Sequence, residues 1–101
     1  MNYQVFFPSV SIEKKFGQVL SQIPQKKIRQ EIMRHVESLA GNPRPFEGKL
    51  FKKLKPPVAL YQLTAQYRLR VGDYRILYDV DDSQRKVWIL ALRRRSEKTY
   101  Q

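Results

Sequence analysis

Several absences narrow the chemistry open to this chain of 101 residues. It has no cysteine, and therefore neither a disulfide framework nor a thiolate nucleophile, which fits a reducing compartment such as the cytoplasm. It has a single histidine, which excludes a conventional zinc site. Asp79, Asp81 and Asp82 cluster where a turn is predicted, and short acidic side chains usually serve turn geometry there. We therefore expect no metal ion and no other cofactor.

Acidic residues are scarce, and long apolar runs are missing. The chain carries 20 lysines and arginines against 9 aspartates and glutamates, a net charge of +11. This excess predicts an anionic partner: a nucleic acid, an acidic protein or, with less support, a membrane surface. The longest apolar run, Val87 to Leu92, is too short to span a bilayer, and residues 1–3 begin neither a signal peptide nor a lipidation motif. We expect a cytoplasmic protein that does not bind membranes.

The first part of the chain predicts a strand followed by a helix. The length and the hydrophobic content of 42% indicate one small domain over residues 1–101. Residues 3–7 read as a short strand that a proline ends. Apolar residues then recur at helical spacing, which predicts a first helix over residues 12–22, with Ser9 or Ser11 as its N-cap.

Pro24 restarts the chain and suits the first turn of a second helix, which Gly41 is expected to close as its C′ residue. The two helices then form a hairpin. Residues 42–48 are rich in proline and glycine and read as a connector. Residues 49–57 mix lysines with apolar residues, and we expect a basic loop that packs across the edge of a sheet.

A β-hairpin is predicted around Gly72-Asp73, because two alternating runs flank this dipeptide and Gly72 can adopt the positive φ of a tight turn. In this hairpin Arg70 lies opposite Arg75, which costs about 0.2–1 kcal/mol through like-charge repulsion. A bound polyanion would relieve the repulsion, since guanidinium groups clasp phosphate oxygens. A solvated basic surface is the alternative. The expected pairs are Val71 with Tyr74, Arg70 with Arg75, Leu69 with Ile76, Arg68 with Leu77 and Tyr67 with Tyr78.

A last strand is expected from residue 86 to 93 or 94. If Val80 pairs with Val87, then Arg94 lies one diagonal step from Arg75, on the face that also carries Arg68. Three arginines from three strands then converge, whereas a slip of one residue would move Arg94 to the helix side. In the preferred register Leu92 faces Arg75. The open face also carries an apolar group, which can form the floor of a site or a contact surface for a partner. This group consists of Leu77, Trp88, Leu90 and Leu92.

These arginines suit the cleavage of RNA. An RNA strand supplies its own nucleophile, the 2′-hydroxyl group, so that a cleaving site needs only positioning, proton transfer and cations around the transition state. No metal ion is needed. Arg68, Arg75 and Arg94 can supply the cations, and Tyr100 can supply a positioned hydroxyl group.

The order of motifs resembles the RelE/ParE superfamily of toxin-antitoxin toxins over nearly the whole chain. The resemblance rests on the helical hairpin that ends in Leu39 to Pro45, on Tyr67 to Tyr78 as the most specific part, and on Arg93-Arg94-Arg95 followed by Tyr100. It implies an α+β fold of βααβββ order. In this RelE-like fold the helical hairpin packs on one face of a small, mainly antiparallel, twisted sheet that cups the active site.

The resemblance also implies residue roles. Arg75 matches the arginine that stabilises the transition state, Arg94 a phosphate-binding arginine, and Tyr100 a tyrosine that helps to activate the 2′-hydroxyl group. The two lysines of the best-studied RelE pattern fall at Gln66 and Arg68. Arginine holds phosphate but is a poor proton donor, which leaves the general acid open. The catalytic residues expected are thus Arg68, Arg75, Arg94 and Tyr100, and the further RNA-binding residues are Gln66, Arg70, Arg93, Arg95 and Lys98.

Within the superfamily, RelE members cleave messenger RNA in the ribosomal A site, and ParE members poison DNA gyrase. Tyr100 favours the nuclease branch. We predict a metal-independent, ribosome-dependent mRNA endonuclease that contacts 16S rRNA and is neutralised by an acidic, RelB-like antitoxin. The antitoxin is expected to cover the basic open face, the apolar group with Trp88, Leu90 and Leu92, or both. The alternatives are a ParE-like gyrase inhibitor without catalysis and an inactive RNA-binding relative.

Overall fold

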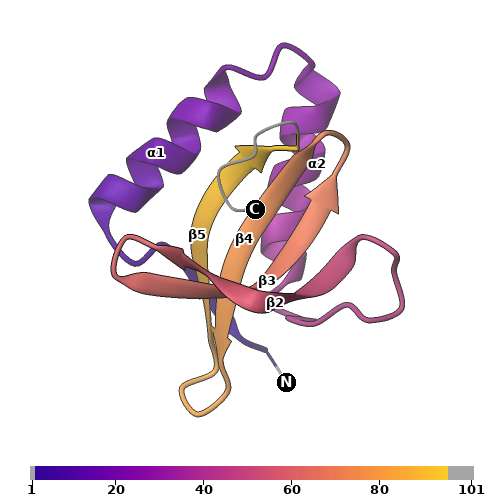
Figure 1. Ribbon diagram of the computed structural model, residues 1–101. Coiled ribbons are helices and arrows are strands. Elements are labelled where there is room, and N and C mark those ends of the chain that lie inside the picture. The colour runs from indigo at the N-terminus through magenta and orange to yellow at the C-terminus, as the bar shows by residue number, and fades with distance from the viewer. Residues whose placement is uncertain (1, 96–101) are drawn as a thin grey trace.

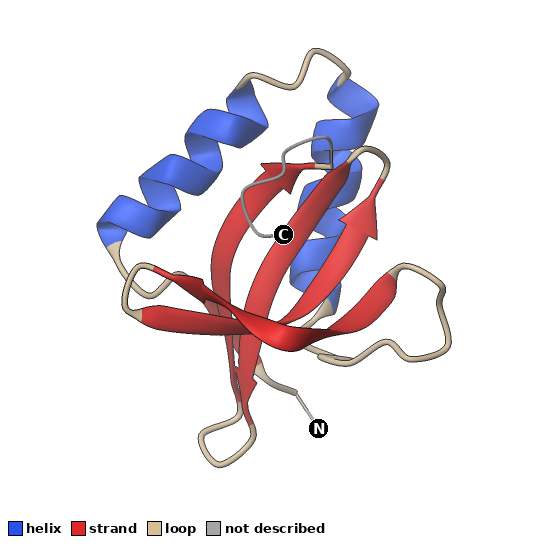
Figure 2. Cartoon of the chain, viewed as in Figure 1, coloured by secondary structure: helices blue, strands red, loops and turns tan. Residues whose placement is uncertain are grey.

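Two helices pack on one face of a five-stranded sheet in the computed structural model, which describes residues 2–95 (Figures 1 and 2). The strand order is β1-β5-β4-β3-β2; β1 runs parallel to β5, and the other neighbours are antiparallel. The α+β class is confirmed, with one strand more than the predicted βααβββ order. The elements are β1 (Gln4–Phe6), α1 (Val10–Ser21), α2 (Lys26–Ser38), β2 (Phe51–Leu60), β3 (Leu63–Val71), β4 (Tyr74–Asp81) and β5 (Lys86–Arg94).

Helix α1 begins at Val10, directly after its N-cap Ser9. The hydroxyl oxygen of Ser9 accepts a hydrogen bond from the amide of Ile12 at 3.1 Å, which confirms Ser9 over Ser11. The helix therefore starts two residues before the predicted position. Ile12 and Phe16 point into the core, as their helical spacing predicted.

Helix α2 ends earlier than predicted. After Ser38 the amides of Leu39, Ala40 and Gly41 bond to carbonyl groups three residues back, so a tightened turn follows the helix. Among the glycines of the described chain, Gly72 alone has a positive φ. The expectation that Gly41 is the C′ residue of this helix is wrong, because the helix ends at Ser38 and the tightened turn after it already satisfies the last carbonyl groups.

The β3–β4 hairpin forms in the predicted register, with all five expected residue pairs. Gly72 has a φ of 58°, the left-handed conformation that this turn requires. The turn fixes the first residue pair, Val71 with Tyr74. The alternation of buried and exposed side chains along both strands then fixes the other four pairs.

Gly72→Ala should lower the free energy of unfolding by about 1–2 kcal/mol, the cost of a left-handed conformation for an L-residue. A Cβ atom at this position would lie 3.5 Å from the Cδ1 atom of Ile28, an ordinary contact, so that the loss comes from the backbone alone. Urea denaturation measures it, with Gly72→Asn as the control, since asparagine tolerates this conformation better. Equal losses in both variants, or none in the alanine variant, would contradict the assignment.

The basic segment that was expected to be a loop is strand β2, which forms a hairpin with β3. It pairs over residues 51–53 and again over residues 58–60, with an irregularity between the two stretches. Pro56 and Pro57 lie in this gap, where their missing amide protons cost no ladder hydrogen bond. Tyr61 and Gln62 form the turn between the two strands, and β3 begins at Leu63.

The missed strand covers the face that was expected to be open. In Figure 1 the β2–β3 hairpin crosses in front of β4 and β5. Leu77 and Leu90 are 0% and 2% exposed under it, and Trp88 is half-buried against the same cluster. The apolar surface that was expected to be exposed is therefore covered by the β2–β3 hairpin. This second core consists of Leu54, Leu60, Ala65, Leu77 and Leu90.

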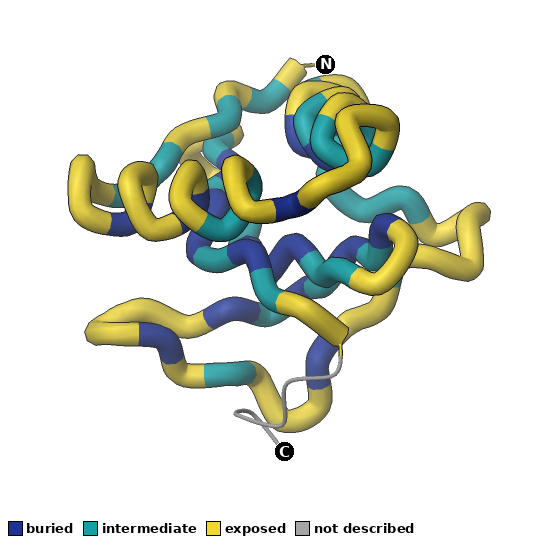
Figure 3. The backbone as a smooth tube through the Cα atoms, turned by 90° about the horizontal axis from the view of Figure 1, so that it is seen from above, coloured by how far each residue is buried: buried dark blue, intermediate teal, exposed yellow. Residues whose placement is uncertain are grey.

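The main core lies between the helices and the sheet, and Figure 3 shows buried segments concentrated on the strands between the helices and the β2–β3 hairpin. Tyr78 and Ile89 are fully buried there. Leu92 belongs to this core and not to the open face. Among the residues described, neither helix is long and apolar enough to cross a membrane.

A bulge in β5 changes the register that was predicted for its end. Val80 pairs with Val87 as expected, but Tyr78 pairs with Ile89 and Leu77 with Ala91, so that Leu90 is an extra residue. Beyond the bulge every pair is shifted by one position, and the predicted neighbours of Arg75 are wrong. The observed pairs are Ile76 with Leu92, Arg75 with Arg93 and Tyr74 with Arg94.

Candidate nucleic-acid interface

A row of arginines crosses three strands on the sheet face opposite the helices. Arg70 of β3 lies opposite Arg75 of β4, which lies opposite Arg93 of β5. Their strand neighbours Leu69, Ile76 and Leu92 point into the helix-side core, so the arginines point away from it. Arg68 lies two residues before Arg70, opposite Lys52 of β2. We call this surface the arginine face: Lys52, Arg68, Arg70, Arg75, Arg93 and Arg95.

The charges on the arginine face act on one another. Burial, together with Arg68, Arg95 and Arg70, lowers the pKa of the Arg75 guanidinium. Burial, together with Arg70 and Arg95, lowers the pKa of Arg68. Arginine still remains protonated at ordinary pH. Positive charge that is crowded and partly desolvated favours the binding of an anion, because the anion relieves both effects.

Backbone carbonyl groups help to orient two of these side chains. Nη1 of Arg68 donates a hydrogen bond to the carbonyl oxygen of Leu50 at 3.1 Å, and Nε of Arg70 donates to that of Gly72 at 3.4 Å. Close to the turn, the amide of Arg95 donates to the carbonyl oxygen of Asp73 at 2.5 Å. The face is thus built on paired strands and on the hairpin turn, and not on free loops.

The structure brings most of the predicted site residues together. Gln66 precedes Arg68 on the same side of β3 and is half-buried, while Arg93 and Arg95 lie at the end of β5. Arg94 does not join them: it lies opposite Tyr74, whose ring packs against the helix-side core. Tyr100 and Lys98 lie outside the described residues.

Lys52 joins the arginine face from a strand, although a basic loop was predicted at this position. It lies opposite Arg68 on β2, a strand whose two prolines and several lysines favoured the prediction of a loop. The alternation of Val58 and Leu60 before the turn was the one signal for this strand.

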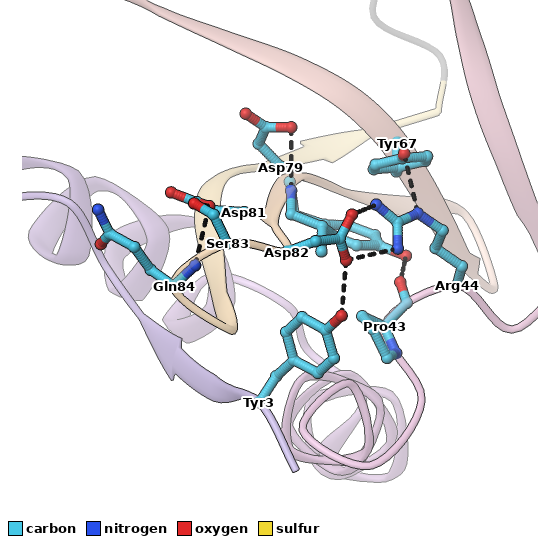
Figure 4. Close-up of polar contacts among 11 residues, drawn as sticks. Tyr3, Pro43, Arg44, Tyr67, Asp79, Asp81, Asp82, Ser83 and Gln84 are labelled. Atoms are coloured by element: carbon cyan, nitrogen blue, oxygen red, sulfur yellow. Dashed lines mark hydrogen bonds and ion pairs between the residues drawn. The ribbon is translucent and has the colours of Figure 1, made fainter. Parts of the chain in front are cut away.

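A second polar cluster joins elements that are distant in the sequence (Figure 4). Nη1 and Nη2 of Arg44 donate to the two carboxylate oxygens of Asp82 at 3.0 and 2.8 Å, and Nε donates to the hydroxyl oxygen of Tyr67 at 2.9 Å. The Tyr3 hydroxyl group donates to Asp82 at 2.6 Å. The cluster therefore ties the connector after α2 to β3, to the β4–β5 turn and to the chain before β1.

Tyr78 of β4 also fixes the connector after α2. Its buried hydroxyl group donates a hydrogen bond to the carbonyl oxygen of Pro43 at 2.7 Å. Burial raises the pKa of the Tyr78 hydroxyl group above its ordinary value. It therefore stays a neutral donor, as this hydrogen bond requires. We interpret the whole cluster around Arg44 as structural.

Asp82→Asn should remove a part of the stability that depends on pH. The hydrogen bonds from Arg44 and then from Tyr3 lower the pKa of Asp82 from 3.8 to about 2. The charged form is stabilised by folding, so the contribution is fully present above the unfolded pKa and is lost as the pH falls through the folded one. The melting temperature of the unmodified chain should exceed that of the variant at neutral pH, and the difference should shrink between about pH 5 and pH 2. A difference that stays constant over this range would contradict the role.

Comparisons with known proteins agree with this architecture. The sequence model of a family described as "ParE toxin of type II toxin-antitoxin system, parDE" matches residues 11–99. A chain of the archaeal RelE-RelB complex from Pyrococcus horikoshii OT3 is 28% identical, covers 96% of this chain and 99% of its own, and has a TM-score of 0.69. No curated protein matches the chain.

Two further solved structures share the fold at lower identity. A chain of the toxin-antitoxin complex RelBE2 from Mycobacterium tuberculosis is 24% identical over 94% of this chain and 100% of its own, with a TM-score of 0.61. A mutant of the E. coli toxin RelE in the free state is 18% identical over 95% of this chain and 86% of its own, with a TM-score of 0.56.

Proposed function

The chain belongs to the ParE toxin family of type II toxin-antitoxin systems, within the RelE/ParE superfamily, and we propose that it is a RelE-like mRNA endonuclease that acts on translating ribosomes in the cytoplasm. The arginine row across β3, β4 and β5 carries the proposal. It is a pre-arranged set of cations on rigid strands, as stabilisation of a transition state that gains negative charge requires.

In the proposed reaction the 2′-hydroxyl group of the messenger RNA attacks the adjacent phosphorus atom. The bond from the 2′ oxygen to phosphorus forms while the bond to the 5′ oxygen breaks, and a cyclic phosphate and a new 5′-hydroxyl end result. The proton of the 2′-hydroxyl group leaves to a base, and the 5′ oxygen gains one from an acid. Arg75 holds the phosphoryl oxygens at the centre of the row, with Arg93 opposite it on β5 and Arg68 one diagonal step away on β3.

We propose that Arg93, and not Arg94, makes the last-strand phosphate contact, since Arg94 lies opposite Tyr74 on the other face. The arginines hold their protons too tightly to protonate the leaving oxygen, so the acid is another group. Tyr100, outside the described residues, is proposed to orient or deprotonate the 2′-hydroxyl group.

An acidic antitoxin of the RelB kind is the proposed partner. The structural relatives in the archaeal and mycobacterial complexes are RelE-RelB assemblies. A net charge of +11 and the arginine face favour an acidic chain that covers this face and so blocks access for RNA. Leu90 and Leu92 are buried and do not add to the binding surface.

A ParE-like inhibitor of DNA gyrase is the second candidate, because the matching family is described by its ParE members. Such a toxin binds its target without chemistry, and its tail tyrosine has no catalytic task.

Primer extension on translated messenger RNA, run beside a gyrase supercoiling assay, decides between the two. We expect the unmodified chain to give cuts that need translating ribosomes and to leave supercoiling intact. Tyr100→Phe should slow the cuts by about 10²–10⁴-fold, as for the loss of a general acid-base group. Inhibition of supercoiling without ribosome-linked cuts, with Tyr100→Phe silent, would replace the proposal by the gyrase candidate.

A further inference from the structure

A cavity opens at the end of the arginine row, between α1, the β2–β3 turn and β5. Its volume is about 280 Å³. Phe16 and Val19 of α1 form one wall, Tyr61 of the turn another, and Arg93 belongs to the lining. Figure 1 shows this turn beside α1, on the β5 side of the sheet. The size lies just under the range of about 300–1,000 Å³ that is usual for ligand pockets, which suits one planar ring system.

Tyr61 occupies a position in the turn that packing does not explain. Its φ of 61° is left-handed, a conformation that favours glycine or asparagine. Its side chain is 57% exposed, so that it adds little to either core. A bulky residue kept in a strained conformation and turned toward a cavity is a common feature of functional sites.

Lys15 places a cation at the same opening. Its Nζ atom lies 4.4 Å from the centroid of the Tyr61 ring. Contacts of this kind at an exposed site are weak and easily exchanged. A planar RNA base can therefore replace the Lys15 ammonium group over the Tyr61 ring. The ammonium group can then bind the phosphate of the adjacent nucleotide.

The edge of β5 adds hydrogen-bonding groups. β1 pairs with β5 only over residues 86–88, and within residues 2–95 no other strand pairs with this edge. Leu90, Ala91 and Leu92, which line the cavity, lie beyond that pairing. Amide and carbonyl groups along an unpaired edge can bond to the edge of a base, and that contact distinguishes one base from another.

Arg93 connects the cavity to the proposed reaction. It lines the cavity, and it lies opposite Arg75 at the centre of the arginine row. A strand whose phosphate lies on the row therefore has a neighbouring base within reach of Tyr61. We propose that the cavity binds one unstacked base of the messenger RNA on the Tyr61 ring and so sets a sequence preference of cleavage; this inference rests on the proposed function.

The test compares the distribution of cut sites on translated messenger RNA. Tyr61→Gly removes the ring and suits the positive φ, so that the turn should keep its shape. We expect cleavage at the preferred sites to fall by about 5- to 100-fold, the range typical of a lost base-stacking residue, and the preference to flatten. Tyr61→Phe, which keeps a stacking ring, should lose less. The matched control is Phe46→Ala, which truncates another exposed aromatic side chain, in the connector between α2 and β2.

The failures of the two proposals are distinguishable. If the unmodified chain cuts and Tyr61→Gly gives the same pattern at the same rate, the base site is overturned and the nuclease stands. If the unmodified chain does not cut on translating ribosomes, the proposed function fails and the base site with it. Loss of antitoxin binding by Tyr61→Gly with an unchanged cut pattern would assign the cavity to the antitoxin and overturn the inference.

Lys15→Glu gives a second variant should the melting curve show that Tyr61→Gly does not fold. Lys15 is exposed on α1, and a carboxylate at the opening should repel RNA and flatten the preference in the same way. An unchanged cut pattern in this variant would also overturn the inference.

Discussion

Arg75→Ala is expected to abolish growth inhibition while the fold persists. Arg75 lies opposite both Arg70 and Arg93, so the variant loses the central cation of the row. The loss of one group that stabilises a transition-state charge costs about 10²–10³-fold in rate. The same change removes two like-charge pairs, each worth about 0.2–1 kcal/mol, and the melting temperature should hold or rise slightly. Growth curves on induction and thermal melts of the purified variant measure the two effects.

Arg34→Ala is the matched control for this variant. It removes the same charge from the exposed side of α2, far from the row, and should leave toxicity unchanged. Full toxicity of Arg75→Ala, at an expression level equal to that of the control, would remove Arg75 from the site.

Arg93→Ala should be far less toxic than Arg94→Ala, although the two residues are neighbours in the chain. The Leu90 bulge turns Arg93 toward the arginine face and places Arg94 opposite Tyr74 on the other face. Loss of a phosphate-binding arginine should cost roughly 10²-fold or more in cleavage, by analogy with other lost transition-state donors. Loss of Arg94 should have a small effect, as for most changes at an exposed residue.

Cleavage rates from primer extension, normalised to the amount of folded protein, provide the comparison. The reverse order, with Arg94→Ala the weaker toxin, would mean that β5 acts in the unshifted register. Equal losses in both variants would mean that net charge near the end of the chain matters more than placement.

The β3–β4 hairpin was predictable from the sequence because its information is local. Gly72-Asp73 fixes the turn, and strict alternation on both sides fixes the faces, so that the opposition of Arg70 and Arg75 followed from a dozen residues. The N-cap at Ser9 was predictable for the same reason.

The end of β5 was not predictable in this way, because a bulge at Leu90 breaks the period of two that fixes which face each side chain lies on. One hint was present: Val87 to Leu92 is continuously apolar, and a strand with one solvated face does not show such a run. Both faces of β5 are in fact covered, one by the helices and the other by the β2–β3 hairpin. The covering strand went unrecognised because Pro56 and Pro57 interrupt it.

The parallel pairing of β1 with β5 has a consequence for the biosynthesis of this chain. Val5 lies beside Val87, so the sheet closes between segments that leave the ribosome far apart in time. Such a distant contact cannot form before residues 86–88 have emerged. Arg93, which completes the row, emerges later still. The arginine row is therefore incomplete until β5 has emerged, and the surface on which the proposed cleavage depends is assembled in one step and not by degrees.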